Sequence, residues 1–151
     1  SLLPRFEADA QYYYKYYNNY KGEYIMEELK LLYCTHCKKI VELIPSTHCC
    51  PTVCCGENMV ELVPNTTEAA TEKHIPVVNV KGNTVEVVVG SVVHPMTEVH
   101  YIQFIYLVTN KNVYRHDLKW NDEPKATFAL TEGEEVKEVL AYCNLHGLWK
   151  K

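Results

Sequence analysis

The stretch Val77-Val78-Asn79-Val80-Lys81-Gly82-Asn83-Thr84-Val85-Glu86-Val87-Val88-Val89 decides the fold class. Its valine-rich halves have the β-branched composition of strands, and Lys81-Gly82-Asn83 between them is typical of a turn, so the stretch predicts a β-hairpin. Residues 101–109, 125–131 and 136–142 are also rich in β-branched and aromatic residues and are separated by turn-rich gaps. Strands that recur at short spacing without long intervening helices predict an all-β sandwich.

Residues that can bind a metal lie at the ends of these predicted strands. His74 precedes the first strand, His94 and His100 flank one loop, and Cys143 and His146 share a tight turn after the last strand. Loops displayed by a rigid β-scaffold commonly carry function. Four imidazoles and one thiolate are too rich in nitrogen for a structural zinc site and too poor in sulfur for an iron–sulfur cluster. The set therefore predicts a mononuclear redox metal.

A second group of candidate ligands lies nearer the amino terminus. Cys34 and Cys37 flank a two-residue turn, the spacing at which two sulfurs of a knuckle bind one ion, and a second knuckle must supply two more sulfurs. Cys49-Cys50 and Cys54-Cys55 both qualify by their chemistry. Four thiolates bind iron and zinc alike with tetrahedral geometry, so the spacing leaves both ions open.

The composition limits the classes of partner. The chain has 151 residues, 47% of them hydrophobic, which is enough for one sizeable core and a small satellite domain held together by metal. Its net charge of -4 gives no indication of binding to nucleic acid or to an anionic membrane surface. No stretch approaches the length of a membrane span, and no basic amino-terminal segment precedes a long apolar run. We therefore expect neither a nucleic-acid nor a membrane partner.

The seven cysteines favour metal binding over a disulfide framework. Their number is odd, and four of them form two adjacent pairs, whose members cannot easily bridge each other. Free thiols that bind metal are typical of a reducing compartment, so we expect a cytoplasmic protein.

Three segments differ in composition. Residues 1–25 carry seven of the twelve tyrosines and are interpreted as an amino-terminal extension, either an appendage or a helix that packs on the body or on a partner. Residues 26–62 contain the cysteine pairs and are interpreted as a small metal-binding domain. A linker is expected over 60–71, and residues 63–151 carry the predicted sandwich.

Several motifs carry a family resemblance. The segments Glu72-Lys73-His74-Ile75-Pro76, Gly90-Ser91-Val92-Val93-His94-Pro95-Met96, His100-Tyr101-Ile102 and Cys143-Asn144-Leu145-His146-Gly147 resemble the motifs of superoxide reductase. Upstream, Cys34-x-x-Cys37 and Cys54-Cys55-Gly56-Glu57-Asn58-Met59 resemble the small iron domain of desulfoferrodoxin, the two-iron form of that family. The resemblance covers roughly residues 26–151, in order, and favours Cys54-Cys55 over Cys49-Cys50 as the second knuckle.

The resemblance implies an architecture and a set of cofactors. It implies an immunoglobulin-like β-sandwich as catalytic domain, preceded by a desulforedoxin-like domain, with two iron ions in each chain. The first iron is expected on four thiolates, those of Cys34, Cys37, Cys54 and Cys55. The second is expected on four equatorial imidazoles, an axial thiolate and an open sixth position, with the ligands His74, His94, His100, His146 and Cys143.

The resemblance also implies an activity and partners. The activity is the one-electron reduction of superoxide to hydrogen peroxide, with electrons from an external rubredoxin-like donor, in a homodimer. Lys73 is expected to attract superoxide to the open position, because a nearby cation raises the local concentration of an anion. Glu72 is implied to occupy that position of the oxidised iron once product has left. The alternatives are a non-catalytic iron electron carrier and a zinc-stabilised interaction module.

Overall fold

The computed structural model describes residues 29–44 and 51–151, so the tyrosine-rich segment of residues 1–25 and the alternative ligands Cys49-Cys50 lie outside the described residues. The described chain is almost entirely strand, with one single-turn helix, α2 (Thr71–His74). The strands are β1 (Lys30–Tyr33), β2 (Ile40–Leu43), β3 (Val53–Cys54), β4 (Glu57–Asn58), β5 (Val60–Glu61), β6 (Pro76–Lys81), β7 (Thr84–Val89), β8 (Ile102–Thr109), β9 (Val113–Asp117), β10 (Lys125–Ala129), β11 (Val136–Cys143) and β12 (Gly147–Lys150).

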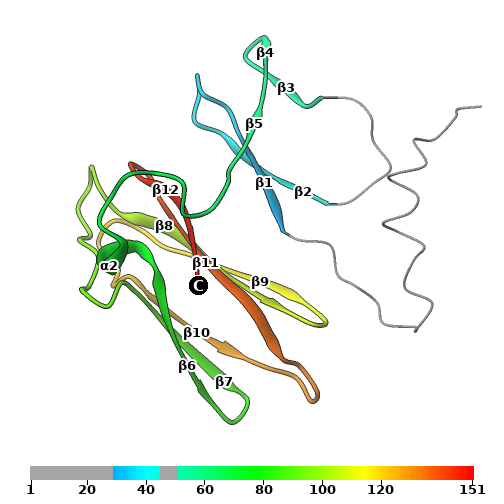
Figure 1. The fold of residues 1–151 in the computed structure, drawn as a ribbon, viewed down its shortest axis with the longest axis vertical. Coiled ribbons are helices and arrows are strands. Elements are labelled where there is room, and N and C mark those ends of the chain that lie inside the picture. The colour runs from blue at the N-terminus through cyan, green and yellow to red at the C-terminus, as the bar shows by residue number, and fades with distance from the viewer. Residues whose placement is uncertain (1–28, 45–50) are drawn as a thin grey trace, which may run out of the picture.

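Strands β6 to β12 form a sandwich of two antiparallel sheets (Figure 1). One sheet has the order β10-β7-β6, and the other has the order β12-β11-β8-β9. The predicted hairpin is present: Lys81 pairs with Thr84, and the turn between them places Gly82 at a φ of 60°, which glycine adopts readily. The prediction of an all-β sandwich is confirmed.

The main core lies between these two sheets. In β7 the inward residues Val85, Val87 and Val89 are fully buried and alternate with half-buried neighbours, as a period of two requires. They meet residues of the facing sheet, among them Ile105 and Ala141, in one continuous apolar cluster. This core holds the two sheets together and fixes the strand ends that carry the candidate ligands.

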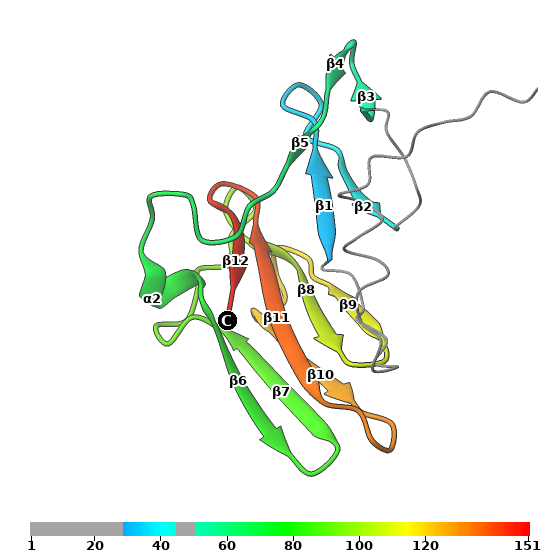
Figure 2. The same ribbon diagram turned by 45° about the vertical axis from the view of Figure 1, so that its right-hand side comes forward.

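A second apolar core joins the small amino-terminal unit to the sandwich. The unit consists of a three-stranded sheet, β2-β1-β5, and the β3–β4 hairpin, and it lies beside β8 and β11 (Figure 2). Leu31 of β1 is 1% exposed and packs with Tyr106, Leu140 and Tyr142 on the outer face of the four-stranded sheet. This explains why β8 and β11 are apolar on both faces. The domain boundaries at residues 25 and 62 stay predictions.

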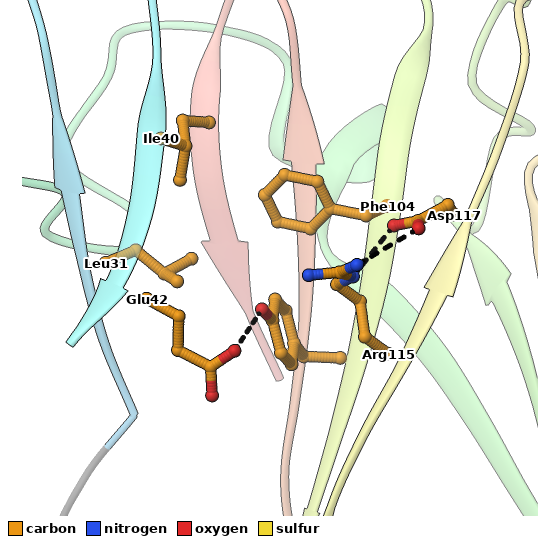
Figure 3. Close-up of a pocket in the computed structure, with 7 residues that line it drawn as sticks. Leu31, Ile40, Glu42, Phe104, Arg115 and Asp117 are labelled. Carbon is orange, nitrogen blue, oxygen red and sulfur yellow. Dashed lines mark hydrogen bonds and ion pairs between the residues drawn. The ribbon is translucent and has the colours of Figure 1, made fainter. Parts of the chain in front are cut away.

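A cavity of about 120 Å³ lies between the small unit and β8 and β9 (Figure 3). On one side of it, the Tyr106 hydroxyl donates a 2.8 Å hydrogen bond to Oε2 of Glu42. On the other side, Arg115 and Asp117 form a 2.9 Å ion pair between Nε and Oδ1. The hydrogen bond from Tyr106 to Glu42 therefore adds a directional contact to the apolar packing between the two parts of the chain.

A buried carboxylate, that of Glu134, lies at the end of the sandwich where β8 ends and β11 begins. Glu134 is 8% exposed and accepts hydrogen bonds of 2.6–2.9 Å. The donors are the Thr109 hydroxyl, the Asn112 amide, the Tyr114 hydroxyl, and the backbone N–H and hydroxyl of Thr131. Burial alone would raise the pKa of Glu134, but these donors outweigh it and hold the pKa well below its ordinary value.

Replacing Glu134 with glutamine is therefore expected to lower the melting temperature at neutral pH, because an amide cannot accept all of these hydrogen bonds. A carboxyl whose pKa is lowered in the folded state stabilises the fold above its unfolded pKa of about 4.3 and loses this effect as the pH falls below that value. Thermal unfolding of both proteins from pH 7 to pH 2 should show the difference shrinking below about pH 4.3. The exposed neighbour Glu132, changed to glutamine, is the control. A difference that does not change with pH would contradict the role assigned to Glu134.

Within residues 29–44 and 51–151, no helix has the length and apolar character that crossing a membrane would require.

Candidate metal centres

Five predicted ligands meet at one end of the sandwich, where β6 begins, β7 and β11 end and β8 begins (Figure 1). His74 ends α2, one residue before β6 begins. His94 and His100 lie on the β7–β8 connection. Cys143 ends β11, and His146 lies in the turn to β12. Their potential ligand atoms all lie within 4.8 Å of one another. Segments distant in the sequence are thus brought together by strand pairing.

The four imidazoles form a closed ring. Going around it, the centroids of His74 and His94 are 4.7 Å apart, and those of His94 and His100 are also 4.7 Å apart. The distances from His100 to His146 and from His146 back to His74 are both 4.9 Å. Neighbouring rings lie 72° to 86° from parallel. The four rings thus form a closed cycle with nearly equal sides, which we call the square.

Hydrogen bonds fix which ring nitrogen of His74 and His94 points inward. The Nδ1 atoms of these residues lie 2.7 Å and 2.6 Å from the carbonyl oxygens of Ala70 and Pro95, which can only accept. Each Nδ1 therefore carries the proton, and the two Nε2 atoms face each other at 3.2 Å with bare lone pairs. Two lone pairs at this distance repel unless a cation lies between them, which is the arrangement expected of metal ligands with carbonyl partners behind them.

The other donors agree with this geometry. Nε2 of His74 is 3.1 Å from Nδ1 of His146, about the separation of two nitrogens bound at right angles to an ion at about 2.1 Å. Nε2 of His100 is buried without a hydrogen-bond partner among the residues that the structure describes. Burial lowers the pKa of His74, His94 and His100, to about 4 for His94, so these imidazoles are neutral and free to bind metal at pH 7.

Cys143 is the fifth member of this group. Its side chain is fully buried, and its Sγ is 3.7 Å from Nδ1 of His146. Burial raises the pKa of the Cys143 thiol, whereas the backbone N–H groups of Leu145 and His146 lower it. A buried thiolate with two N–H groups directed at it fits a metal ligand, because the cation compensates its charge. Four imidazoles with one thiolate fit iron.

The loop after β7 supports the turn that carries Glu72 and Lys73. The carbonyl oxygen of Glu72 accepts hydrogen bonds from the Val92 backbone N–H at 2.9 Å and from the Ser91 hydroxyl at 3.2 Å. The side chains of Glu72 and Lys73 are exposed. Burial and the neighbouring histidines are larger causes of the lowered pKa of His74 and His100, and the charge of Lys73 lowers both further. Glu72 is not among the groups that gather within 4.8 Å of one another there.

Gly90 allows this close approach. Its φ is +87°, and a Cβ at this position would lie 2.7 Å from the carbonyl oxygen of Lys73 and against that of Val92. Glycine is required here both by the backbone conformation and by the lack of space.

Replacing Gly90 with alanine is expected to displace Lys73 and His74 and to weaken iron binding at the histidine site by about tenfold or more. Gly82→Ala is the matched control, because Gly82 also has a positive φ of 60°, whereas a Cβ added to it would meet nothing within 4 Å. Iron release to a chelator measures the effect. If both variants release iron at equal rates, the close contact at Gly90 does not position the site.

The four-cysteine site is formed by two turns of the small unit. Cys34 and Cys37 lie between β1 and β2, and Cys54 and Cys55 belong to the β3–β4 hairpin. The Sγ atom of Cys54 is 3.6 Å from that of Cys37 and 4.0 Å from that of Cys55. These distances bracket the roughly 3.8 Å between sulfurs bound tetrahedrally at about 2.3 Å. The backbone N–H of Cys37 lowers the pKa of Cys34 to about 6, which favours a thiolate.

A side-chain contact links the two turns of this site. Nε2 of His36 lies 2.8 Å from Oε2 of Glu57. Cys55 and Gly56 both have positive φ, 52° and 79°, which produces the tight turn that directs the sulfurs toward those of the first knuckle. The described chain thus brings together all nine predicted ligands, in two separate groups.

A β-sandwich with a His4Cys ligand set, joined to a small domain with four thiols, defines a protein class that would hold two mononuclear non-haem irons. The Desulfoferrodoxin family model matches residues 66–151. The desulfoferrodoxin of Syntrophotalea carbinolica is 45% identical over 123 residues, which is 82% of this chain and 95% of that protein. The desulfoferrodoxin homolog of Archaeoglobus fulgidus is 42% identical, covering 82% of this chain and 97% of that protein. This chain belongs to the desulfoferrodoxin family.

A solved structure agrees with this assignment. The superoxide reductase from Treponema pallidum superimposes with a TM-score of 0.70 at 38% sequence identity, covering 83% of this chain and 99% of that chain. The predicted desulfoferrodoxin resemblance and fold are thereby confirmed. Two residues that contact the site were not among the predicted site residues: Gly90 borders the backbone of Lys73, and the Trp149 ring stacks on His74. Gly90 had a usable signal, a glycine directly after a strand, whereas Trp149 had none.

Proposed function

We infer that this chain is a superoxide reductase that carries two iron ions, one in each site. The observation that carries the inference is the closed square of four imidazoles with the buried Cys143 sulfur among them, all ligand atoms lying within 4.8 Å of one another. Iron bound among these donors supplies the single electron that superoxide takes up on its way to hydrogen peroxide. The relatives from Thermococcus kodakarensis and Pyrococcus abyssi are also named superoxide reductase, at 32% and 35% identity over 52% of this chain.

The residues around the site have distinct tasks. The carbonyl oxygens of Ala70 and Pro95 hold His74 and His94 in the orientation that presents Nε2. Cys143 is buried, whereas Lys73, the residue before His74, is exposed, and we propose that superoxide approaches the site from solvent past Lys73. The Lys73 ammonium attracts the anion and stabilises the negative charge that accumulates as the electron is added. Two protons from solvent complete hydrogen peroxide.

Glu72 is proposed to cap the oxidised site. Its carboxylate lies outside the group of ligand atoms, and it lines a cavity of about 380 Å³ beside β6. The carboxylate therefore has to turn toward the square after product has left. Glu72→Ala is expected to change the visible spectrum of the oxidised protein and to leave the first reaction with superoxide at its original rate. An unchanged oxidised spectrum would contradict the capping role.

The decisive test of the function is the stoichiometry of a superoxide pulse. Reduced protein with both irons is mixed with superoxide, and hydrogen peroxide, oxygen and oxidised iron are measured. A reductase yields one hydrogen peroxide for each superoxide, releases no oxygen and loses one electron for each superoxide. A dismutase would divide the product between peroxide and oxygen, and a protein that only carries electrons would not be oxidised by superoxide at a comparable rate. Either of these results would overturn the proposed function.

The electrons must come from outside the chain, and we propose a rubredoxin-like small carrier as the donor. We also propose a homodimer, because association adds buried surface to small domains. The five cysteines in the described part of the chain are free, which supports a reducing, cytoplasmic location. Reduction of the protein by a purified rubredoxin and sedimentation of the iron-loaded chain test the first two proposals.

A further inference from the structure

Trp149 touches two neighbouring corners of the histidine square. Its ring stacks on that of His74, with centroids 4.8 Å apart and planes 25° from parallel. Its indole Nε1–H donates a 3.0 Å hydrogen bond to the backbone carbonyl of His146. His74 and His146 are adjacent in the square, and they come from α2 and from the β11–β12 turn, elements far apart in the sequence. One side chain therefore contacts both.

The backbone of Trp149 is held on both sides. On one side, β12 pairs with β11, where Ala141 is opposite Trp149. On the other side, the Asn65 backbone N–H donates to the Leu148 carbonyl at 3.0 Å, and the Asn65 amide binds the backbone of Lys150 at 2.8 Å and 3.0 Å. Trp149 itself is 1% exposed. Its indole is thus a fixed surface, whereas His74 lies on a single helical turn, where the Ala70 carbonyl accepts from its Nδ1 at 2.7 Å and the Trp149 ring covers its face.

The remaining two corners have their own supports. His94 is held by the carbonyl of Pro95, and His100 by a pair of backbone hydrogen bonds with Thr97 at 2.9 Å and 3.1 Å. The square is therefore assembled from two halves. The β7–β8 connection fixes His94 and His100, and Trp149 is the side chain that links His74 to His146.

We propose that Trp149 is a positioning residue for the iron centre. The indole face sets the plane of the His74 ring, and the indole N–H sets the turn that carries both Cys143 and His146. The proposal rests on the proposed function only for the identity of the metal, since it concerns how the ligands are held. Its consequences are slower loss of iron and a defined reduction potential of the histidine-ligated iron.

Two substitutions separate the two contacts. Trp149→Phe keeps an aromatic face toward His74 and removes the N–H donor, whereas Trp149→Leu removes both. We expect iron release from the histidine site to a chelator to rise about tenfold or more in the leucine variant, with the phenylalanine variant in between. We expect the midpoint potential of that iron to shift in the same order. The four-cysteine iron in the same molecule is an internal control whose potential should stay constant.

Trp120→Phe is the matched control, because Trp120 is the only other tryptophan of the chain and is 47% exposed. If both Trp149 variants keep the iron-release rate and the potential of the unmodified protein, the proposal is wrong. A lowered melting temperature with both quantities unchanged would show that Trp149 only fills space, and this would also overturn it. Should the leucine variant fail to fold, the phenylalanine variant decides alone. None of these measurements uses superoxide, so failure of the proposed function would be seen separately.

Discussion

His94→Ala will lose the iron of the histidine site and abolish the reduction of superoxide, while the four-cysteine iron stays bound. His94 is 1% exposed, and its Nε2 lies 3.2 Å from that of His74 inside the square. Alanine removes one ligand and leaves an open corner next to His74 and His100. Iron per chain, measured by elemental analysis, should fall from two to one, and the spectrum of the sulfur-ligated iron should remain.

His116→Ala is the control for this prediction, because His116 is exposed on β9 and lies outside both metal sites. It should retain two irons and the full rate. Iron on the four thiols shows that the small domain of the His94 variant is folded, because these thiols bind iron only when the β1–β2 and β3–β4 turns are in place. A His94 variant that still reduces superoxide at the original rate would show that the histidine square is not the reaction site.

Lys73→Ala will lower the second-order rate constant with superoxide by at least about tenfold at low ionic strength, with iron content and absorption unchanged. Lys73 is exposed and directly precedes the ligand His74, and its charge contributes to the lowered pKa of His74 and His100. Added salt screens such attraction over about 10 Å at 0.1 M, so the difference from the unmodified protein should narrow as ionic strength rises. Stopped-flow mixing or pulse radiolysis at several salt concentrations measures it.

Lys81→Ala is the matched charge control. Lys81 ends β6, about 17 Å along the strand from its beginning beside the site, and it pairs with Glu86 at 2.9 Å. Removing this cation changes the net charge by the same amount without altering the charge at the square. Equal losses of rate in both variants would assign the effect to overall charge, and an unchanged rate in Lys73→Ala at low salt would remove Lys73 from the reaction.

The sequence predicted the parts of the fold that depend on local pattern. The β6–β7 hairpin followed from two valine-rich runs around a glycine turn, and β8, β10 and β11 lie within a few residues of their predicted ranges. β9 was not predicted, because Val113-Tyr114-Arg115-His116-Asp117 is polar at most positions and gains its strand character by pairing with β8. Its place at the sheet edge is a tertiary property, which a local pattern does not contain.

Predicting the site was easier than predicting its supports. Each ligand, such as His94 or Cys143, is a residue type that commonly binds metal, and its motif placed it in order along the chain. The supports of the site come from backbone carbonyls, from a glycine and from an aromatic ring. The role of Gly90 depends on where the backbone of Lys73 runs, and that of Trp149 depends on where β12 ends. Both contacts, at Gly90 and at Trp149, form only after the strands have paired.

The second apolar core has a consequence for how the chain can be divided. Leu31 covers Tyr106, Leu140 and Tyr142 on the outer face of the four-stranded sheet. A shortened protein without the small unit would expose those side chains to water as a contiguous apolar surface. Such a surface promotes aggregation or self-association. The catalytic part is therefore not a module that can be excised unchanged. A soluble single-domain version of this molecule would first need polar residues on that face of the sheet.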